Sequence, residues 1–180
     1  LPLAGSTFKK VYYDQLLGRA VSKFIPAEDL IVPYTATSLD EAESIIHSLK
    51  ISENDLRKQQ VNGFYSDVEL GPPGVDNNDE LTKKEREISG TKKTGRQESV
   101  YNVLECHVNL DLEGFEDMDP ETGEPTGIKL PYIVTVEEAS RQILSIKRNY
   151  APDDAKKNKI QYFVHFKFLP GLGFYGFGLI

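Results

Sequence analysis

The sequence predicts an α+β fold, mostly an antiparallel β meander, with two short helices and a long polar insertion. Runs of β-branched and aromatic residues recur along the chain between clusters of Gly, Pro, Asn and Asp. In the second half, apolar and polar residues alternate with the period of two that marks half-buried strands. A chain of 180 residues, 39% of them hydrophobic, can bury a core of its own, so we expect residues 1–180 to form a single domain.

The first third is expected to hold a small sheet of three strands. Residues Phe8–Asp14 and Arg19–Phe24 have the composition of a β-hairpin around a glycine-containing turn. Leu30–Val32 is a third short strand with prolines on both sides. The prolines favour an edge position, because proline donates no hydrogen bond to a neighbouring strand.

Two capping patterns predict the helices. Ser38 with Glu41 three residues later is a capping box, which predicts a short helix that begins there. Ser52 caps a second helix, in which acids precede bases as the helix dipole favours, and Gly63 follows it as a stop signal. The intervening residues 45–51 fit either a helix or a strand.

Residues 71–99 are predicted to be a flexible polar insertion. Charged residues, Asn and Gly dominate this segment, and its apolar residues are Val75, Leu81 and Ile88. A fragile helix near residues 81–88 is the most regular structure that the pattern allows. We expect the insertion to be dispensable for folding.

The second half is predicted to consist of strands. In residues 100–112 two faces alternate, and the apolar face should turn toward the core while the polar face meets the solvent. The apolar face holds Leu104, Cys106, Val108, Leu110 and Leu112, and the polar face holds Glu105, His107, Asn109 and Asp111. Three more strands are expected at residues 127–136, 142–148 and 160–169. Their connections hold no convincing crossover helix, which favours antiparallel pairing between neighbours.

Composition excludes several kinds of site and partner. The one cysteine, Cys106, cannot form an internal disulfide or, by itself, a thiolate zinc site. The net charge of −7 argues against a tight grip on duplex DNA, because phosphate contacts need clustered Lys and Arg. No stretch approaches the roughly 20 apolar residues of a membrane span, so no membrane partner is expected.

A glycine-rich run near the end is the most tempting motif. Residues 171–176, Gly-Leu-Gly-Phe-Tyr-Gly, match the G-x-G-x-x-G pattern of dinucleotide-binding loops. A pyrophosphate would need a helix that starts near Gly173 and binds it through backbone amides. The preceding Pro170, the bulky aromatic residues inside the run and the short stretch after it favour another interpretation, in which the glycines let aromatic side chains pack in a bend.

An acidic stretch raises the possibility of a calcium site. Asp117, Asp119 and Glu121 alternate like the first ligands of an EF-hand loop. Thr122 stands where that loop needs a glycine, and Ile128 where it needs a bidentate glutamate. The sequence therefore favours a solvated hairpin loop, with weak cation binding as the alternative.

Nucleophile and histidine patterns point to no active site. The histidines, His47, His107 and His165, are far apart in sequence and would converge only through the fold. Cys106 and His107 point to opposite faces of a regular strand, so Cys106 is predicted to be a small buried core residue. No nucleophile elbow, phosphate-binding loop or zinc-binding helix motif is present. We therefore assign no catalytic, cofactor-binding or metal-binding residues and expect no enzyme activity and no cofactor.

Several stretches carry a resemblance to a known family. They are Phe8–Asp14, Phe24–Tyr34, Leu56-Arg57-Lys58 with Gly63-Phe64-Tyr65, Leu130–Thr135 and, most strongly, Leu169–Ile180. In this order they resemble the portal proteins of tailed bacteriophages, in the large form of the short-tailed phages. No single stretch is diagnostic of a chemistry. Their number and order carry the resemblance across nearly the whole chain apart from the polar insertion.

The resemblance implies a structural component of the portal ring, the head-tail connector at a capsid vertex through which DNA is packaged and ejected. The full-length protein would form a homo-oligomeric ring, usually a dodecamer, and would meet the packaging terminase, the tail adaptor and capsid proteins. DNA would pass through the ring without sequence-specific binding. The location implied is the virion, with the bacterial cytoplasm during assembly or a prophage as the source.

Under this resemblance the chain is an internal fragment from the wing region or a neighbouring part. It lacks the long stem helices of a whole portal, and we expect the isolated fragment to be monomeric. Two other classes stay open. One is a nucleotide-binding or enzymatic domain that uses the run Gly171–Gly178, and the other is a generic adaptor of a virion or secretion machine.

Overall fold

The computed structural model describes residues 3, 5–14, 17–75, 99–171 and 173–179. The fold is α+β, mostly β, with one α-helix and one 3-10 turn in the described part. The elements are β1 (Ser6–Asp14), β2 (Arg19–Ile25), η1 (Ala27–Asp29), β3 (Leu30–Ile31), β4 (Ser44–Ser52), α1 (Glu53–Val61), β5 (Gly74–Val75), β6 (Ser99–Leu110), β7 (Leu130–Glu137), β8 (Ile143–Arg148) and β9 (Phe163–Lys167).

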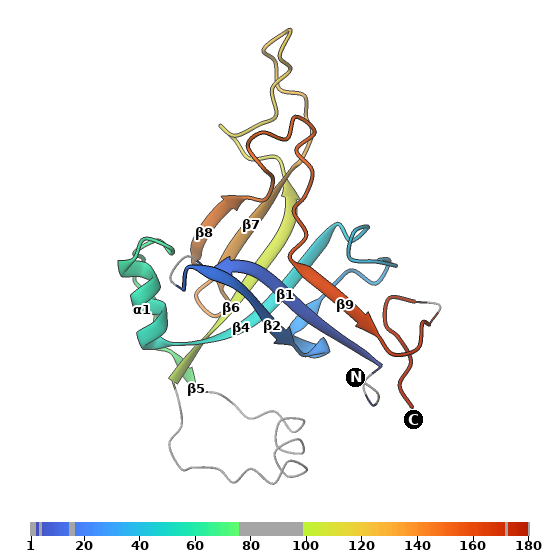
Figure 1. Cartoon of the computed structure of the whole chain (residues 1–180). Helices are drawn as coiled ribbons and strands as arrows, with labels where there is room; N and C mark the ends of the chain where they lie inside the picture. Colours follow the sequence, from blue (N-terminus) through green and yellow to red (C-terminus); the bar gives the residue numbers. More distant parts are fainter. Residues whose placement is uncertain (1–2, 4, 15–16, 76–98, 172, 180) are drawn as a thin grey trace. The chain divides into compact units, whose positions relative to one another are not determined.

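The strands form two antiparallel sheets (Figure 1). One sheet has the order β2-β1-β9, and the other has the order β3-β4-β6-β7-β8 with the short β5 paired to β6. The second sheet contains the predicted meander from β6 to β8. The first sheet assembles strands from both ends of the described chain.

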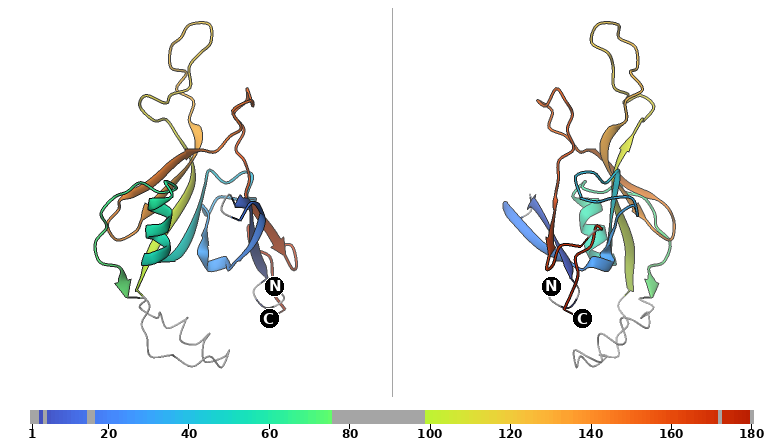
Figure 2. Two further views of the ribbon diagram at one scale, coloured as in Figure 1. Left: turned by 60° about the vertical axis from the view of Figure 1, so that its left-hand side comes forward. Right: turned by 90° about the vertical axis from the view of Figure 1, so that its right-hand side faces the viewer.

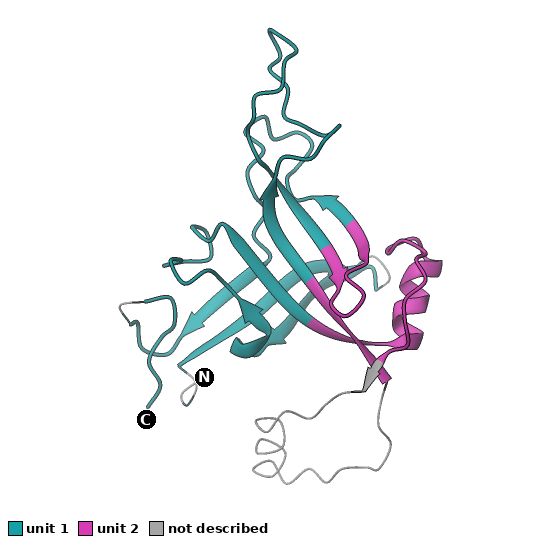
Figure 3. Ribbon diagram, turned by 180° about the vertical axis from the view of Figure 1, so that it is seen from behind, with its two compact units in different colours: residues 1–48, 105–134, 146–180 teal, residues 49–104, 135–145 magenta. Residues whose placement is uncertain are grey.

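The chain divides into two compact units (Figure 3). Unit 1 comprises residues 1–48, 105–134 and 146–180, and unit 2 comprises residues 49–104 and 135–145. Each unit has its own hydrophobic core. The core of unit 1 contains Phe8, Ile25, Leu30, Ala36, Leu39, Ala42, Ile45, Phe163 and Phe174, and the core of unit 2 contains Leu56, Tyr65, Tyr101, Val103 and Leu144.

The predicted hairpin is present as β1 and β2, with Phe8 opposite Ile25. The prediction that Leu30–Val32 completes this sheet is wrong, although its edge position is confirmed. β3 pairs with β4 at the edge of the other sheet, because η1 redirects the chain after β2. The third strand beside β1 is instead β9, as Figures 1 and 2 show, so β9 also leaves the expected meander.

The first predicted helix does not form. The amide of Glu41 donates to Ser38 Oγ at 3.2 Å, so the capping hydrogen bond exists, but it closes a turn. Residues 44–52 then form β4, which settles the ambiguity at 45–51 in favour of a strand. A helix of so few residues is marginal in isolation, and sheet pairing of the following segment provides the stronger constraint.

The second predicted helix is confirmed as α1. Ser52 Oγ accepts the Asp55 amide hydrogen at 3.2 Å, Glu53 and Asp55 lie in the first turn, and Gly63 follows with a φ of 71°. On its inner side Gln60 is buried, and its amide donates to the carbonyls of Ser66 and Val68. These bonds hold the chain against the helix within unit 2.

The predicted polar insertion is described only at its ends. The Tyr101 hydroxyl donates to the carbonyl of Gly71 at 2.9 Å, and β5 pairs with the start of β6. These contacts show that the first residues of the predicted 71–99 segment belong to the fold. The fragile helix expected near residues 81–88 lies outside the described residues.

The inward face of β6 is the reverse of the predicted one. Tyr101, Val103 and His107 are buried, whereas Leu104 and Cys106 are only half-buried. The predicted period of two is correct, but the face that turns inward is the one that carries Glu105 and His107. β6 lies between β4 and β7, so the covering of each face depends on segments remote in sequence, which alternation by itself does not specify.

Candidate functional site

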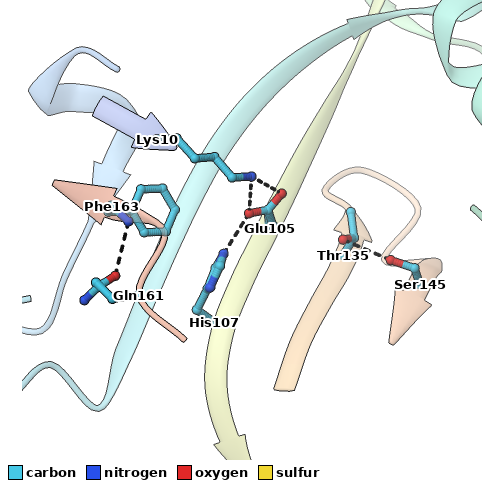
Figure 4. A network of polar contacts seen from close by, with 7 residues as sticks. All are labelled: Lys10, Glu105, His107, Thr135, Ser145, Gln161 and Phe163. Atoms are coloured by element: carbon cyan, nitrogen blue, oxygen red, sulfur yellow. Dashed lines mark hydrogen bonds and ion pairs between the residues drawn. The ribbon is translucent and has the colours of Figure 1, made fainter. Parts of the chain in front are cut away.

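A cluster of polar side chains inside unit 1 is the most unusual feature of the described residues. Lys10 from β1 places its Nζ 2.5 Å from Glu105 Oε1 and 2.7 Å from Oε2, while His107 Nε2 lies 2.7 Å from Oε1 (Figure 4). Glu105 and His107 are two residues apart on β6 and so share a face. Lys10 lies on the inner face of β1, between Phe8 and Tyr12.

The cluster is largely removed from solvent. The side chains of Lys10, Glu105 and His107 are 14%, 15% and 2% exposed. Burial by itself would raise the pKa of Glu105, but the hydrogen bond from His107 and the charge of Lys10 outweigh it and lower that pKa to about 2. Glu105 is therefore ionised at neutral pH and balances the ammonium group of Lys10.

Aromatic and imidazole rings surround the ion pair. The Phe163 ring from β9 lies edge-on to His107 at 5.0 Å and to His47 at 5.8 Å between ring centroids. His47 is buried, and burial first and the charge of Lys10 second lower its pKa to about 4, so it is neutral at pH 7. Its Nδ1 has no hydrogen-bond partner among the described atoms.

The geometry indicates a structural role for this cluster. The Glu105 carboxylate already accepts three charge-assisted or imidazole contacts, and such bonds are short, strong and directional. A buried pair of this kind specifies one arrangement more than it adds net stability. We infer that it sets which face of β6 turns inward in unit 1. Sequence reasoning singled out neither Lys10 nor Glu105, because their partners lie on different strands.

The third histidine and the cysteine lie elsewhere. His165 stacks against Phe8 and Phe174, with its Nε2 3.0 Å from Ser6 Oγ, so His47 and His107 converge while His165 does not join them. Cys106 is half-exposed, which corrects the expectation of a buried core residue. Burial and then the charge of Glu105 raise the pKa of its thiol, the opposite of what a nucleophilic cysteine needs.

The glycine-rich run forms a bend in its described residues. No helix occurs in residues 173–179. The amide of Gly176 donates to Ser6 Oγ at 2.8 Å, and a side chain at Gly176 would meet the carbonyls of Gly5 and Leu169 at 2.8 Å. A glycine is therefore required at position 176, because other backbone segments approach it closely. Phe174, two residues earlier, is buried in the core of unit 1. The described part of the run thus has the geometry of the packing interpretation, with glycine where backbone segments meet and an aromatic side chain in the core.

The acidic stretch forms a hairpin loop that extends past the ends of β6 and β7 (Figure 1). Asp117 pairs with Lys157 and accepts from Thr126 Oγ1 at 2.8 Å. The Asp119 carboxylate accepts the Glu121 amide at 2.8 Å. Two of the three residues predicted to resemble calcium ligands thus bind their own chain. Asp117 and Lys157 are among the residues that line a cavity of about 760 Å³ beside the loop.

A second polar group closes the β7–β8 hairpin in unit 2. Glu137 is 3% exposed and accepts from the amide and the hydroxyl of Ser140, both at 2.6 Å. Ser145 and Thr135 share a hydroxyl hydrogen bond of 3.2 Å across the two strands (Figure 4). These contacts fix the hairpin turn.

Neither a metal cluster nor a membrane helix is found in the described part. No three His, Cys, Asp or Glu side chains there are grouped so that they could hold a metal ion. Of the described helices, none has the length and apolar character to cross a membrane.

No known protein-family signature matches the chain, and no curated protein matches it significantly.

Proposed function

We propose that this chain is a structural component of a bacteriophage portal ring, a head-tail connector through which DNA is packaged and ejected. The observation that carries the proposal is the ordered series of stretches from Phe8–Asp14 to Leu169–Ile180 that resemble large portal proteins. Under this proposal the full-length subunit forms a ring, usually a dodecamer, and contacts the terminase, the tail adaptor and capsid proteins.

The location of these stretches in the structure supports the proposal. The first, second and last of them supply Phe8, Ile25, Leu30 and Phe174, all buried in one core. These stretches therefore help to build the core of unit 1, and Leu56 and Tyr65 from another of them lie in the core of unit 2, as expected when a family shares a scaffold instead of a catalytic constellation.

Exposed apolar side chains in the same stretches give further support. Phe24, Phe177 and Leu179 are 63%, 62% and 68% exposed, and Tyr34 is fully exposed. Large apolar residues on a surface are typical of proteins that are covered by partners in an assembly. A ring subunit has such partners on two sides.

The test is to image the complete subunit that contains this chain. We expect closed rings with a central channel wide enough for duplex DNA in electron micrographs of the purified protein. In an infection, deletion of the gene should leave capsids empty of DNA, and the intact gene should restore packaging. A subunit that stays monomeric at all concentrations, or a deletion that leaves packaging intact, would refute the proposal.

A further inference from the structure

The three-stranded sheet of unit 1 has two open edges. Its order is β2-β1-β9, so β2 and β9 each lack a neighbour on one side in the described part of the chain. The Val11 amide donates to the Tyr162 carbonyl, and the Phe168 amide donates to the Gly5 carbonyl, both at 2.8 Å. On β9 it is therefore the even-numbered residues whose backbone groups bond to β1. Odd-numbered residues of β9 therefore direct their backbone groups away from β1.

The outer edge of β9 is satisfied at its two ends and open between them. At one end the Phe163 amide donates to its neighbour Gln161 Oε1 at 3.3 Å. At the other end Leu169 exchanges two backbone hydrogen bonds with Phe177, at 2.8 and 3.3 Å. The outward backbone groups of His165 and Lys167 have no hydrogen-bond partner among the described residues. Such an edge is a template for another strand.

A built groove runs beside this open stretch. Phe163, Val164, His165 and Lys167 line a cavity of about 360 Å³, and the loop of residues 37–40 lines its other side. The loop is held in place by Lys159, whose Nζ donates to the carbonyls of Leu39 and Ala42 at 3.3 and 3.1 Å. The groove is therefore part of the folded unit and borders the open stretch of β9.

The β2 edge of the same sheet offers a complementary surface. By the same pairing rule Ala20, Ser22 and Phe24 direct their backbone groups away from β1. Phe24 and Val164 both lie opposite Lys9, so their side chains lie on one face of the sheet. Phe24 is 63% exposed and Val164 44% exposed, so joining the two edges would cover both.

We propose that the β9 edge of one copy receives the β2 edge of a second copy, so that the three-stranded sheets of neighbouring subunits join into one. Both open edges, the apolar side chains beside them and the groove belong to the same sheet. The groove lining offers Asp40 as a partner for Arg19 and Lys23 on the groove-side face of β2, although it also carries Lys167. Such a head-to-tail contact repeats from copy to copy and closes into a ring when the rotation permits.

This inference rests on the proposed function for its ring, but the strand pairing can be tested alone. β9 and β2 run in the same direction, since each is antiparallel to β1, so the junction is a parallel pair. Parallel pairing is somewhat weaker per residue. We therefore expect a transient contact in the isolated chain, which a covalent trap can capture.

The trap uses two single-cysteine variants of the full chain, Phe24→Cys and Val164→Cys, each in a Cys106→Ala background, because both positions lie level with Lys9. Neighbouring strands are about 4.8 Å apart, which is within the distance that a disulfide bridges. Under mild oxidation we expect the mixture of both variants to yield several-fold more covalent dimer than either variant alone. Equal yields in all three samples would overturn the proposal.

A proline at the edge provides the matched control. Lys167→Pro removes an outward donor that takes no part in the β1 pairing, whereas Lys167→Ala removes only the side chain. On the Val164→Cys copy the proline should reduce the dimer yield several-fold and the alanine should not. If the proline variant fails to fold, Ala20→Pro on the Phe24→Cys copy removes an outward donor from the other edge and should have the same effect. A dimer yield that no edge proline changes would refute strand pairing.

The outcome is separable from that of the proposed function. Rings of the complete subunit that never give the disulfide between Phe24→Cys and Val164→Cys would refute the edge pairing and leave the portal proposal standing. A specific disulfide in a subunit that forms no ring would do the reverse.

Discussion

Replacing Glu105 by glutamine tests whether the buried cluster contributes as its geometry indicates. The change keeps the size of the side chain but removes the negative charge that faces Lys10 at 2.5 Å. The pKa of Glu105 falls from 4.5 to about 2 in the folded chain, and each pKa unit corresponds to about 1.4 kcal/mol. At neutral pH the folded state with an ionised Glu105 should therefore be about 3 kcal/mol more stable than the same fold with this carboxyl neutral.

The pH dependence has a defined sign. A carboxylate with a lowered pKa contributes stability above its unfolded value of 4.5, and this contribution is lost as the pH falls toward about 2. The deficit of Glu105→Gln should accordingly be largest at pH 7 and shrink below pH 4.5. Urea unfolding at pH 7, 4 and 3, followed by circular dichroism, measures it.

Two further variants sharpen this test. Glu113→Gln removes the same charge from an exposed position and should change the free energy of unfolding by less than about 0.5 kcal/mol. Adding Lys10→Met to Glu105→Gln should recover part of the loss, because no buried charge is then left unpaired. A deficit below about 1 kcal/mol at pH 7, or one that stays constant down to pH 3, would refute the reasoning.

Three other predictions concern packing, titration and association. Gly5→Ala should lower the free energy of unfolding by more than about 2 kcal/mol in thermal unfolding, because a side chain there would overlap the backbone of Gly176 and φ is 72°. The control Gly18→Ala has a φ of 61° but open space around it, so it should lower the free energy of unfolding by only about 1 kcal/mol. Stability should fall between pH 6.5 and about 4 as neutral His47 is forced to protonate, and His47→Leu should lose that part of the pH profile. In sedimentation the chain should be monomeric at micromolar concentration and associate only as salt rises, because copies with a charge of −7 repel one another; a stable ring at low salt would contradict this.

The origin of that charge is local. Residues 111–128 hold seven of the 28 acidic residues and none of the 21 basic ones, so the rest of the chain has 21 of each sign and is balanced. The hairpin loop between β6 and β7, residues 111–129, also contains Lys129, so it carries six of the seven net negative charges. Repulsion between copies should depend mainly on how closely these loops approach.

Local patterns were sufficient for the elements whose determinants lie within a few residues of one another. The β1–β2 hairpin and α1 follow from turn and capping residues that act on their own segment, as the bond from Asp55 N to Ser52 Oγ shows. The capping box at Ser38 makes its hydrogen bond as well. It forms only a turn, because sheet pairing of the residues that follow prevails over a weak local signal.

The polar cluster and the first sheet were decided by contacts between segments far apart in sequence. Alternation along β6 identifies two faces but not which one is inside, since that depends on Lys10, 95 residues before Glu105, and on Phe163 from β9. From the sequence alone a charged residue is expected at the surface, because burying a charge costs free energy unless a partner lies beside it. The sequence therefore determined the period of the strands and the ends of α1. The tertiary structure decided which face of β6 is buried, because the fold brings the carboxylate of Glu105 on that face to the ammonium group of Lys10.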